Sequence, residues 1–191
     1  MPEGETLTRI VGRMIAYLRK MRGGGKRPRR ASLAEIFVAW VGALLAVGMI
    51  AFLDRLTVGS GGPPLLVASF GASSVLVFGA IKSPFAQPRN LVGGHVLSAL
   101  VGVTMGRLLP EPLWLCLGLT AASAIAVMHL TKTLHPPGGA TALIAIIGGE
   151  KIRALGYWYV LTPCCLGALI MLLVAVVINN IPRTRRYPQY W

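Results

Sequence analysis

The chain has 191 residues, of which 54% are hydrophobic and only 13% are charged. The charged share is about half of that in a soluble globular domain, and a water-soluble core cannot absorb so much apolar surface in so short a chain. Lys and Arg number 19 against 6 Asp and Glu, a balance that would suit a nucleic-acid-binding protein. Nine of the basic residues lie in the first 30 positions, before any long apolar stretch, where the positive-inside rule explains them better. The composition therefore predicts an integral membrane protein.

Residues 1–32 form the first expected unit, a basic cytoplasmic tail. Apolar residues recur in it at steps of three and four, with basic residues between them: Leu7, Ile10, Val11, Met14, Leu18 and Met21. This spacing predicts an amphipathic basic helix on the inner leaflet, ended by Gly23–Gly25 and followed by the basic run from Lys26 to Arg30. A disordered basic tail that only sets the topology is the alternative. The basic region is too long for a secretory signal peptide, and no small-residue cleavage site follows it.

Six apolar segments follow in the expected membrane domain, residues 33–182. Four of them, 33–53, 91–109, 113–131 and 158–181, have the roughly 20 residues that a bilayer core requires. The other two, 65–81 and 140–149, are short and broken. Residues 54–64, 82–90 and 150–157 are expected to be loops, and 183–191 a basic cytoplasmic C-terminal tail. The fold class predicted is an all-α transmembrane helix bundle.

The order of long and short segments suggests two three-segment repeats, roughly 33–109 and 113–181. The repeats are inverted if the short segments cross the membrane, and parallel if they are re-entrant. Charge counting favours six crossings, which leave only four basic residues outside: Arg55, Arg107, Lys151 and Arg153. Chance recurrence of small-residue triplets is the alternative to a repeat.

One stretch carries the strongest chemical signal, His135-Pro136-Pro137-Gly138-Gly139-Ala140-Thr141. Proline is preorganised for the start of a helix, and the unpaired N–H groups and positive dipole end there attract anions. Transporters use broken helices near the midplane in this way. The matching half-site is expected in the other short segment, from Ser69, Gly71, Ala72, Ser73 and Ser74. A simple Pro–Gly turn between helices is the alternative.

The acidic residues give a complementary signal, because all six lie at segment ends, in loops or in the tail. A cation path or a carboxylate proton relay would need one in mid-membrane. The ionisable groups near or in the bilayer are instead Lys132, His95, His129 and His135, which suit an anion. The sequence has no nucleophile–base pairing and no metal-ligand spacing, so we expect no enzymatic activity, no cofactor and no metal.

Two sequence blocks resemble the HPP family of integral membrane proteins. The first is the run from Leu130 to Leu143, which contains the His-Pro-Pro triplet. The second comprises residues 69–76, residues 83–90 and the Gly93-Gly94-His95 triplet. The resemblance covers about residues 35–181 and implies nitrite transport, as in members from chloroplasts and cyanobacteria, with a role in nitrogen assimilation. It also gives gate or support positions: Lys132, Gln87, Arg89, Asn90 and His95.

These observations predict a membrane transporter or channel for a small inorganic anion, with nitrite as the leading substrate. The alternative is a non-transporting membrane sensor or scaffold. We expect a bacterial inner (plasma) membrane with both termini cytoplasmic. The expected partners are the lipid bilayer, a small anion and, because six segments make a small protein, further copies of the chain; nucleic acid is not expected.

Overall fold

The computed structural model describes residues 3–21, 25 and 29–191, and the described residues form helices without strands. The chain divides into two units, residues 1–31 and a bundle formed by Ser32–Trp191. Each unit is considered by itself. The helical fold class that the sequence predicts is confirmed.

The first unit contains one helix, α1 (Glu3–Lys20). Within residues 9–20 of this helix the apolar side chains are exposed, among them Ile10, Met14 and Leu18. The amphipathic helix predicted from the spacing is therefore present. Its predicted end at Gly23–Gly25 and the basic run from Lys26 fall largely outside the described residues.

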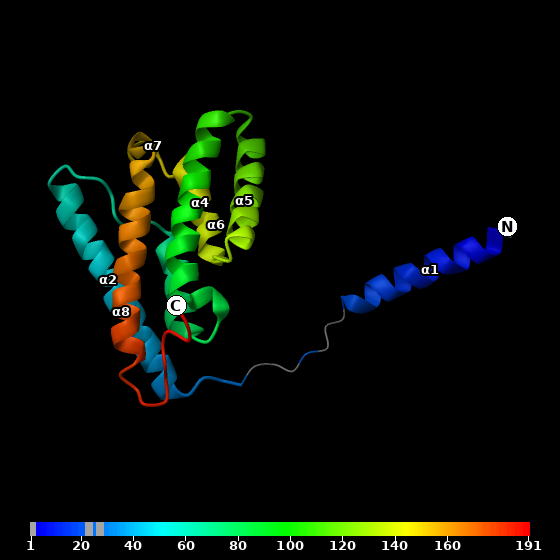
Figure 1. The fold of residues 1–191 in the computed structure, drawn as a ribbon, viewed down its shortest axis with the longest axis horizontal. Coiled ribbons are helices and arrows are strands. Elements are labelled where there is room, and N and C mark those ends of the chain that lie inside the picture. The colour runs from blue at the N-terminus through cyan, green and yellow to red at the C-terminus, as the bar shows by residue number, and fades with distance from the viewer. Residues whose placement is uncertain (1–2, 22–24, 26–28) are drawn as a thin grey trace. The chain divides into compact units, whose positions relative to one another are not determined.

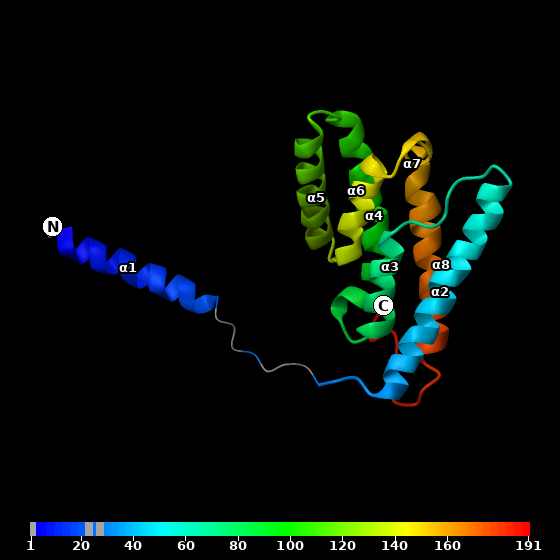
Figure 2. The ribbon, with the colours of Figure 1, turned by 180° about the vertical axis from the view of Figure 1, so that it is seen from behind.

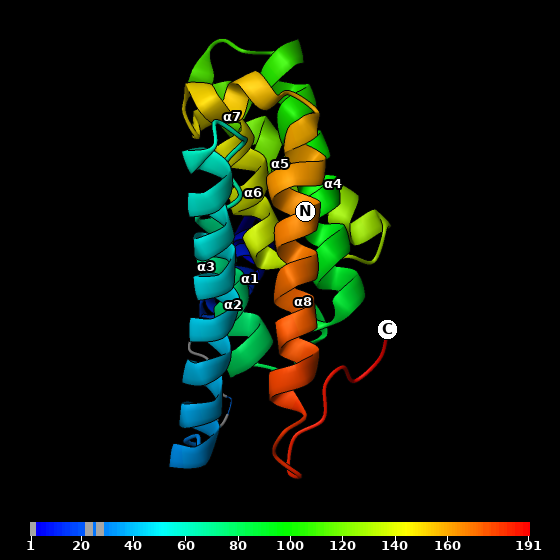
Figure 3. The same cartoon turned by 90° about the vertical axis from the view of Figure 1, so that its left-hand side faces the viewer.

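Four long helices of the bundle are apolar enough to cross a membrane. They are α2 (Leu33–Gly59), α4 (Pro88–Leu108), α5 (Leu113–Leu130) and the last span, in which the π-helical turn η3 (Val160–Cys165) continues into α8 (Leu166–Asn179). Figures 1 and 3 show α2 beside α8, and these two helices are in direct contact. The four full-length spans agree with the hydropathy pattern.

The first span is longer than the predicted 33–53, because α2 continues to Gly59. Asp54, expected in a loop, stays inside the helix. Its carboxylate accepts the backbone N–H groups of Leu65 and Leu66 at 2.6 and 2.9 Å. These bonds fasten the returning chain to α2 and satisfy the carboxylate at the same time.

The two short segments are helical for only part of a bilayer's thickness. The first comprises α3 (Ser69–Ser74) and the π-helical turn η1 (Val75–Gly79). The second is α6 (Pro136–Ile147), which begins before the predicted residue 140 because Pro136 is tolerated at the first helical position. In Figure 2, α3 lies between α2 and the α4–α6 pair, and it contacts both α2 and α6. Figure 1 shows the turn between α5 and α6 well inside the length of α8 rather than at its end.

Two predicted loops contain helical turns. α7 (Glu150–Leu155) lies within the expected loop 150–157, and η2 (Pro84–Ala86) within 82–90. The short α7 buries Ile152 against the bundle, a tertiary contact that the polar local sequence does not signal. The two-repeat relation and the crossing or re-entrant path of the short segments stay predictions.

The C-terminal tail packs against the bundle. The Arg185 guanidinium donates to the Phe78 carbonyl at 2.7 Å, and the Tyr187 hydroxyl donates to the Ala86 carbonyl at 2.7 Å. Tyr187 is buried, and this burial raises the pKa of its phenol, which keeps the hydroxyl a neutral donor. Residues 183–191 therefore form a strap that crosses the loop before α4.

Candidate functional site

Five polar side chains meet in the interior of the bundle, and each is at most 1% exposed. They come from both short segments and from α4: Ser69, Ser73, His95, His135 and Thr141. We call this set the polar network. Ser69 and Ser73 lie on α3, His135 immediately precedes α6, and Thr141 lies on α6. The two short segments that the sequence paired as half-sites are thus joined through side chains.

Ser73 lies at the centre of the network. Its Oγ is 2.7 Å from Nε2 of His95 and 2.8 Å from Nε2 of His135. On the far side, Nδ1 of His95 is 2.7 Å from Thr141 Oγ1, and Thr141 Oγ1 is 2.8 Å from Ser69 Oγ. A continuous series of hydrogen bonds therefore links residues that lie up to 72 positions apart in the sequence.

A hydrogen count orients this series. Nδ1 of His135 lies 2.8 Å from the Phe85 carbonyl oxygen, which only accepts, so Nδ1 carries the hydrogen. In a neutral imidazole Nε2 must then accept, and the single hydroxyl proton of Ser73 satisfies it. Neutral His95 must consequently donate from Nε2 to Ser73 and accept at Nδ1 from the Thr141 hydroxyl. With both imidazoles neutral, this arrangement gives every imidazole nitrogen a partner.

The same geometry accommodates one more proton. A proton added to Nδ1 of His95 would be donated to Thr141, whose hydroxyl would then turn to donate to Ser69 Oγ. The hydroxyl rotates while the heavy atoms stay in place. The polar network can therefore exist as a neutral or a cationic unit, and the Thr141 hydroxyl donates to Ser69 Oγ only in the cationic unit.

The backbone donors expected at the helix starts are largely occupied. At α6, Pro136 and Pro137 have no N–H, and the N–H of Gly138 donates to the His135 carbonyl at 2.7 Å. At α3, the N–H groups of Phe70 and Gly71 donate to carbonyls three residues earlier. Side chains rather than free N–H groups thus occupy the meeting point in this structure. The backbone anion site stays a prediction.

The remaining predicted site residues divide by exposure. Pro137 and Gly138 are buried beside the network, whereas the others lie wholly or partly on the outer surface of the short helices: Gly71, Ala72, Pro136, Gly139 and Ala140. Ser74 donates to the Gly71 carbonyl of its own helix. A Cβ added at Gly139 would meet no atom within 4 Å. The outer face of α6 therefore has room for larger residues.

Three of the predicted gate or support residues fasten the polypeptide around the network. The Gln87 amide donates to the carbonyls of Ile81 and Ser83 at 2.9 and 2.8 Å, which fixes the loop that carries Phe85. Asn90 donates to the Leu134 carbonyl at 2.8 Å, and Arg89 donates to the Thr131 carbonyl at 2.9 Å. These bonds tie the start of α4 to the turn between α5 and α6.

Two residues beside the network were not singled out from the sequence. Tyr159 is fully buried and its hydroxyl donates to the Thr141 carbonyl at 2.9 Å. Ser98 lies one helical turn after His95, and its buried hydroxyl has no hydrogen-bond partner within the described part of the chain. Tyr159 reads as an interfacial aromatic in sequence, and only the fold brings it to Thr141.

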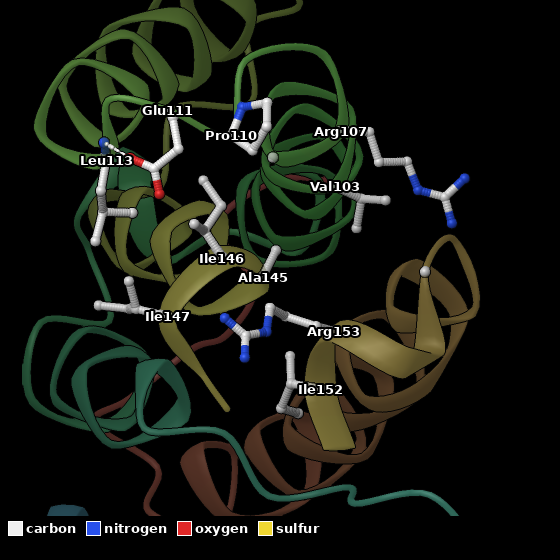
Figure 4. Close-up of a pocket in the computed structure, with 12 residues that line it drawn as sticks. Val103, Arg107, Pro110, Glu111, Leu113, Ala145, Ile146, Ile147, Ile152 and Arg153 are labelled. Atoms are coloured by element: carbon white, nitrogen blue, oxygen red, sulfur yellow. Dashed lines mark hydrogen bonds between the residues drawn. The ribbon is translucent and has the colours of Figure 1, made fainter. Parts of the chain in front are cut away.

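A separate pocket of about 490 Å³ lies at the other end of α4. Arg107, Glu111 and Arg153 line it together with apolar side chains of α6 and α7. Figure 4 shows the Arg153 guanidinium over the middle of the pocket, near Ala145 and Ile147, while Arg107 extends away from Glu111. Arg107 also lies over the Tyr157 ring, 4.8 Å from its centroid. No residue of the polar network lines this pocket.

The comparisons with known proteins agree on the class of protein. The model of the family described as HPP, transmembrane region, matches residues 28–188. Two transmembrane proteins of Dictyostelium discoideum are similar, with 43% identity over 180 residues and 41% over 192 residues. The alignments cover 93% and 98% of this chain but 58% and 67% of the relatives. No solved structure matches the chain.

Both relatives come from a eukaryote. They support an integral membrane protein, together with the four apolar helices. The bacterial inner membrane and the cytoplasmic side of the termini stay predictions.

Proposed function

This chain belongs to the HPP transmembrane family, and on that premise we propose that it carries a small inorganic anion across a bilayer, with nitrite as the leading substrate. One observation carries the proposal. The two short helical segments meet in a buried polar network that contains imidazoles and hydroxyls but no carboxylate. Polar and ionisable groups within a membrane domain are costly, and they mark substrate and proton pathways.

The chemistry of the network suits an anion better than a cation. Hydroxyl and imidazole N–H groups can replace the water of an anion, whose burial without such donors is very costly. The network also has the capacity for one additional proton on His95, which would make it an opposite charge for the anion. A cation would meet no carboxylate among the five side chains.

Basic residues at both ends of α4 add to this argument. Arg89 and Lys132 line a pocket beside the start of α4, and Arg107 and Arg153 line the pocket at its end. Fixed positive charge at the mouths of a path raises the local anion concentration, whereas a neutral interior avoids trapping the anion. Nitrite itself follows from the family resemblance and not from the geometry of these residues.

Uptake by proteoliposomes tests the proposal. Purified protein is reconstituted, and the entry of labelled nitrite is followed against empty liposomes. Chloride, nitrate and formate are assayed in parallel. Uptake of nitrite supports the proposal in full, and uptake of another anion alone corrects the substrate. If correctly inserted protein takes up none of the four anions, the proposal of transport is wrong.

Two substitutions locate the path within the same assay. A Cβ at Gly139 meets no atom within 4 Å, so we expect Gly139→Leu to fold, with steric loss of uptake if the anion passes the start of α6. His135→Ala should weaken uptake and flatten its pH dependence, because it removes the imidazole that orients the Ser73 hydroxyl and, through it, His95. If both variants transport like the wild type, the anion passes elsewhere.

A non-transporting membrane sensor or scaffold is the second candidate. The separate amphipathic helix α1, which carries basic residues and exposed apolar ones, favours it as an attachment to anionic lipid or to another protein. If the wild-type protein shows no uptake of any of the four anions, the sensor or scaffold function is favoured. We propose no enzymatic activity.

A further inference from the structure

We propose that the pocket between the start of α4 and the end of α5 is a second binding site, selective for a small oxyanion and roofed by the C-terminal tail. The pocket has a volume of about 440 Å³. Arg89, Asn90 and Lys132 line one part of it, and Tyr190 and Trp191 line another. The role of the site as an entry station rests on the proposed transport function, whereas its affinity for an anion does not.

The charge of the lining points to an anion. Arg89 and Lys132 contribute cationic groups, His129 contributes an imidazole, and the lining contains no Asp or Glu. The Arg89 guanidinium is held in place by its bond to the Thr131 carbonyl. Because a guanidinium has five N–H donors in a planar fork, it keeps donors for a ligand. A planar fork suits the two oxygens of nitrite, nitrate or a similar oxyanion.

The backbone of Lys132 supplies a second, independent observation. Lys132 has a positive φ of 56°, which makes it the one residue other than glycine with a positive φ among those that the structure describes. It follows α5 as the left-handed residue of a Schellman ending, in which its N–H donates to His129 and the N–H of Thr133 donates to Met128 at 2.9 Å. Glycine is the usual residue here because a side chain strains this conformation. A lysine at a strained position indicates a use for its side chain.

The roof is held by specific bonds. The Tyr187 hydroxyl donates to the Ala86 carbonyl at 2.7 Å, and the Gln189 N–H donates to the side-chain oxygen of Gln87 at 2.8 Å. Asn180 bonds both backbone groups of Tyr187. The tail is thus anchored just before Tyr190 and Trp191, which places aromatic side chains against the basic ones.

The pocket adjoins the polar network without being part of it. Asn90, in its lining, donates to the carbonyl of Leu134, the residue before His135. Gln87, which binds the tail, lies two residues after Phe85, whose carbonyl accepts from Nδ1 of His135. An anion in the pocket would therefore lie next to the residues that hold the His135 imidazole, immediately before the polar network.

Trp191 provides a reporter within the site. In a variant with Trp40, Trp114 and Trp158 changed to Phe, all tryptophan emission comes from Trp191. The protein is kept in uncharged detergent and titrated with nitrite or nitrate at constant ionic strength, with N-acetyltryptophanamide as the reference. We expect a saturable change in emission. A linear change like that of the reference compound would overturn the proposal.

Lys132→Gly separates binding from folding. Glycine relieves the positive φ, so thermal stability should be equal or higher, while the anion affinity falls at least tenfold; Lys132→Arg should retain it. Lys82→Gly, which removes a charge from an exposed turn, is the matched control and should bind like the wild type. Unchanged affinity in Lys132→Gly contradicts the site.

A lipid phosphate has the same charge chemistry as a free oxyanion, so the reporter variant is also placed in nanodiscs with and without phosphatidylglycerol. A response to this lipid with none to nitrite or nitrate overturns the small-anion assignment. If the protein binds nitrite or nitrate saturably but shows no uptake, the second binding site is supported and the proposed transport function is wrong. If the protein shows uptake but no saturable binding, the transport function is supported and the second binding site is wrong.

Discussion

The two short segments approach their neighbours in different ways. The backbones of α6 and α4 are in direct contact at Gly102. A Cβ at this position would collide with the Ala142 carbonyl. In the α3–η1 segment, phenylalanine rings pack against glycines of neighbouring helices. Phe70 packs against Gly167 of α8, and Phe78 packs against Gly42 of α2.

This difference separates a fixed part of the site from a more adaptable one. A ring can slide or turn over a glycine, whereas two backbones in contact move only as a unit. η1 is also a π-helical turn, a feature frequent at functional sites. We therefore expect α4 and α6 to act as a frame and α3–η1 to supply the movement that opens the buried network.

The largest effect is expected from the same substitution at two buried glycines. Gly102→Ala must push α6 away from α4, and overpacking of this kind costs about 3 kcal/mol at the upper end of its usual range. Gly42→Ala displaces only the Phe78 ring and should cost about 1 kcal/mol. Thermal unfolding in detergent measures both. Equal losses would show that the two contacts are equally rigid.

Loss of an imidazole from the centre of the site is expected to have the next largest effect. His135→Ala removes one of the two imidazole partners of the Ser73 hydroxyl and leaves the Phe85 carbonyl without its imidazole donor. A buried polar group without a partner costs about 1–3 kcal/mol, so nitrite uptake should fall roughly tenfold while most of the protein stays folded. Initial uptake rates at several pH values give the result. Leu130→Ala, on the exposed end of α5, is the control and should keep its pH profile.

Thr141 tests the side of the network that belongs to the frame. Thr141→Val keeps the shape but removes the hydroxyl between His95 and Ser69, whereas Thr141→Ser keeps it. With about 1 kcal/mol for one net hydrogen bond, uptake should fall roughly fivefold in the valine variant and recover in the serine variant. If serine is as impaired as valine, packing of the methyl group rather than the hydroxyl determines the effect.

The sequence predicts the parts of this fold that depend on local pattern. Long apolar runs give the four spans, and Pro136–Pro137 gives the start of a short helix. The pairing of the two short segments also followed, because each carries hydroxyls beside small residues. The hydrogen-bond partners of each side chain could not be predicted from the sequence. Ser73 contacts imidazoles 22 and 62 positions away, and no periodicity encodes such a contact.

Other features were missed for related reasons. The strap formed by the C-terminal tail depends on single hydrogen bonds, such as that from Tyr187 to Ala86, in a segment whose composition reads only as a basic tail. The occupied backbone donors at α6 result from the short bond between Gly138 and His135, which only coordinates reveal. The sequence therefore indicates which residue types gather at the site but not which of their donors remain free.

The smallest effect is expected from the N-terminal unit, residues 1–31. Its role would be orientation and attraction to anionic lipid, with each basic residue near such a leaflet contributing about 1 kcal/mol. Removal of residues 1–28 should lower binding of the protein to anionic lipid and leave the nitrite turnover of inserted protein unchanged. Neither the frame nor the polar network includes a residue from this unit, so we expect turnover not to depend on it. Uptake per inserted molecule, with orientation determined by labelling cysteines placed at Lys82 and Lys151, measures this. A loss of turnover at equal insertion would make α1 part of the transport mechanism, and the comparison between frame and adaptable segment would then have to include it.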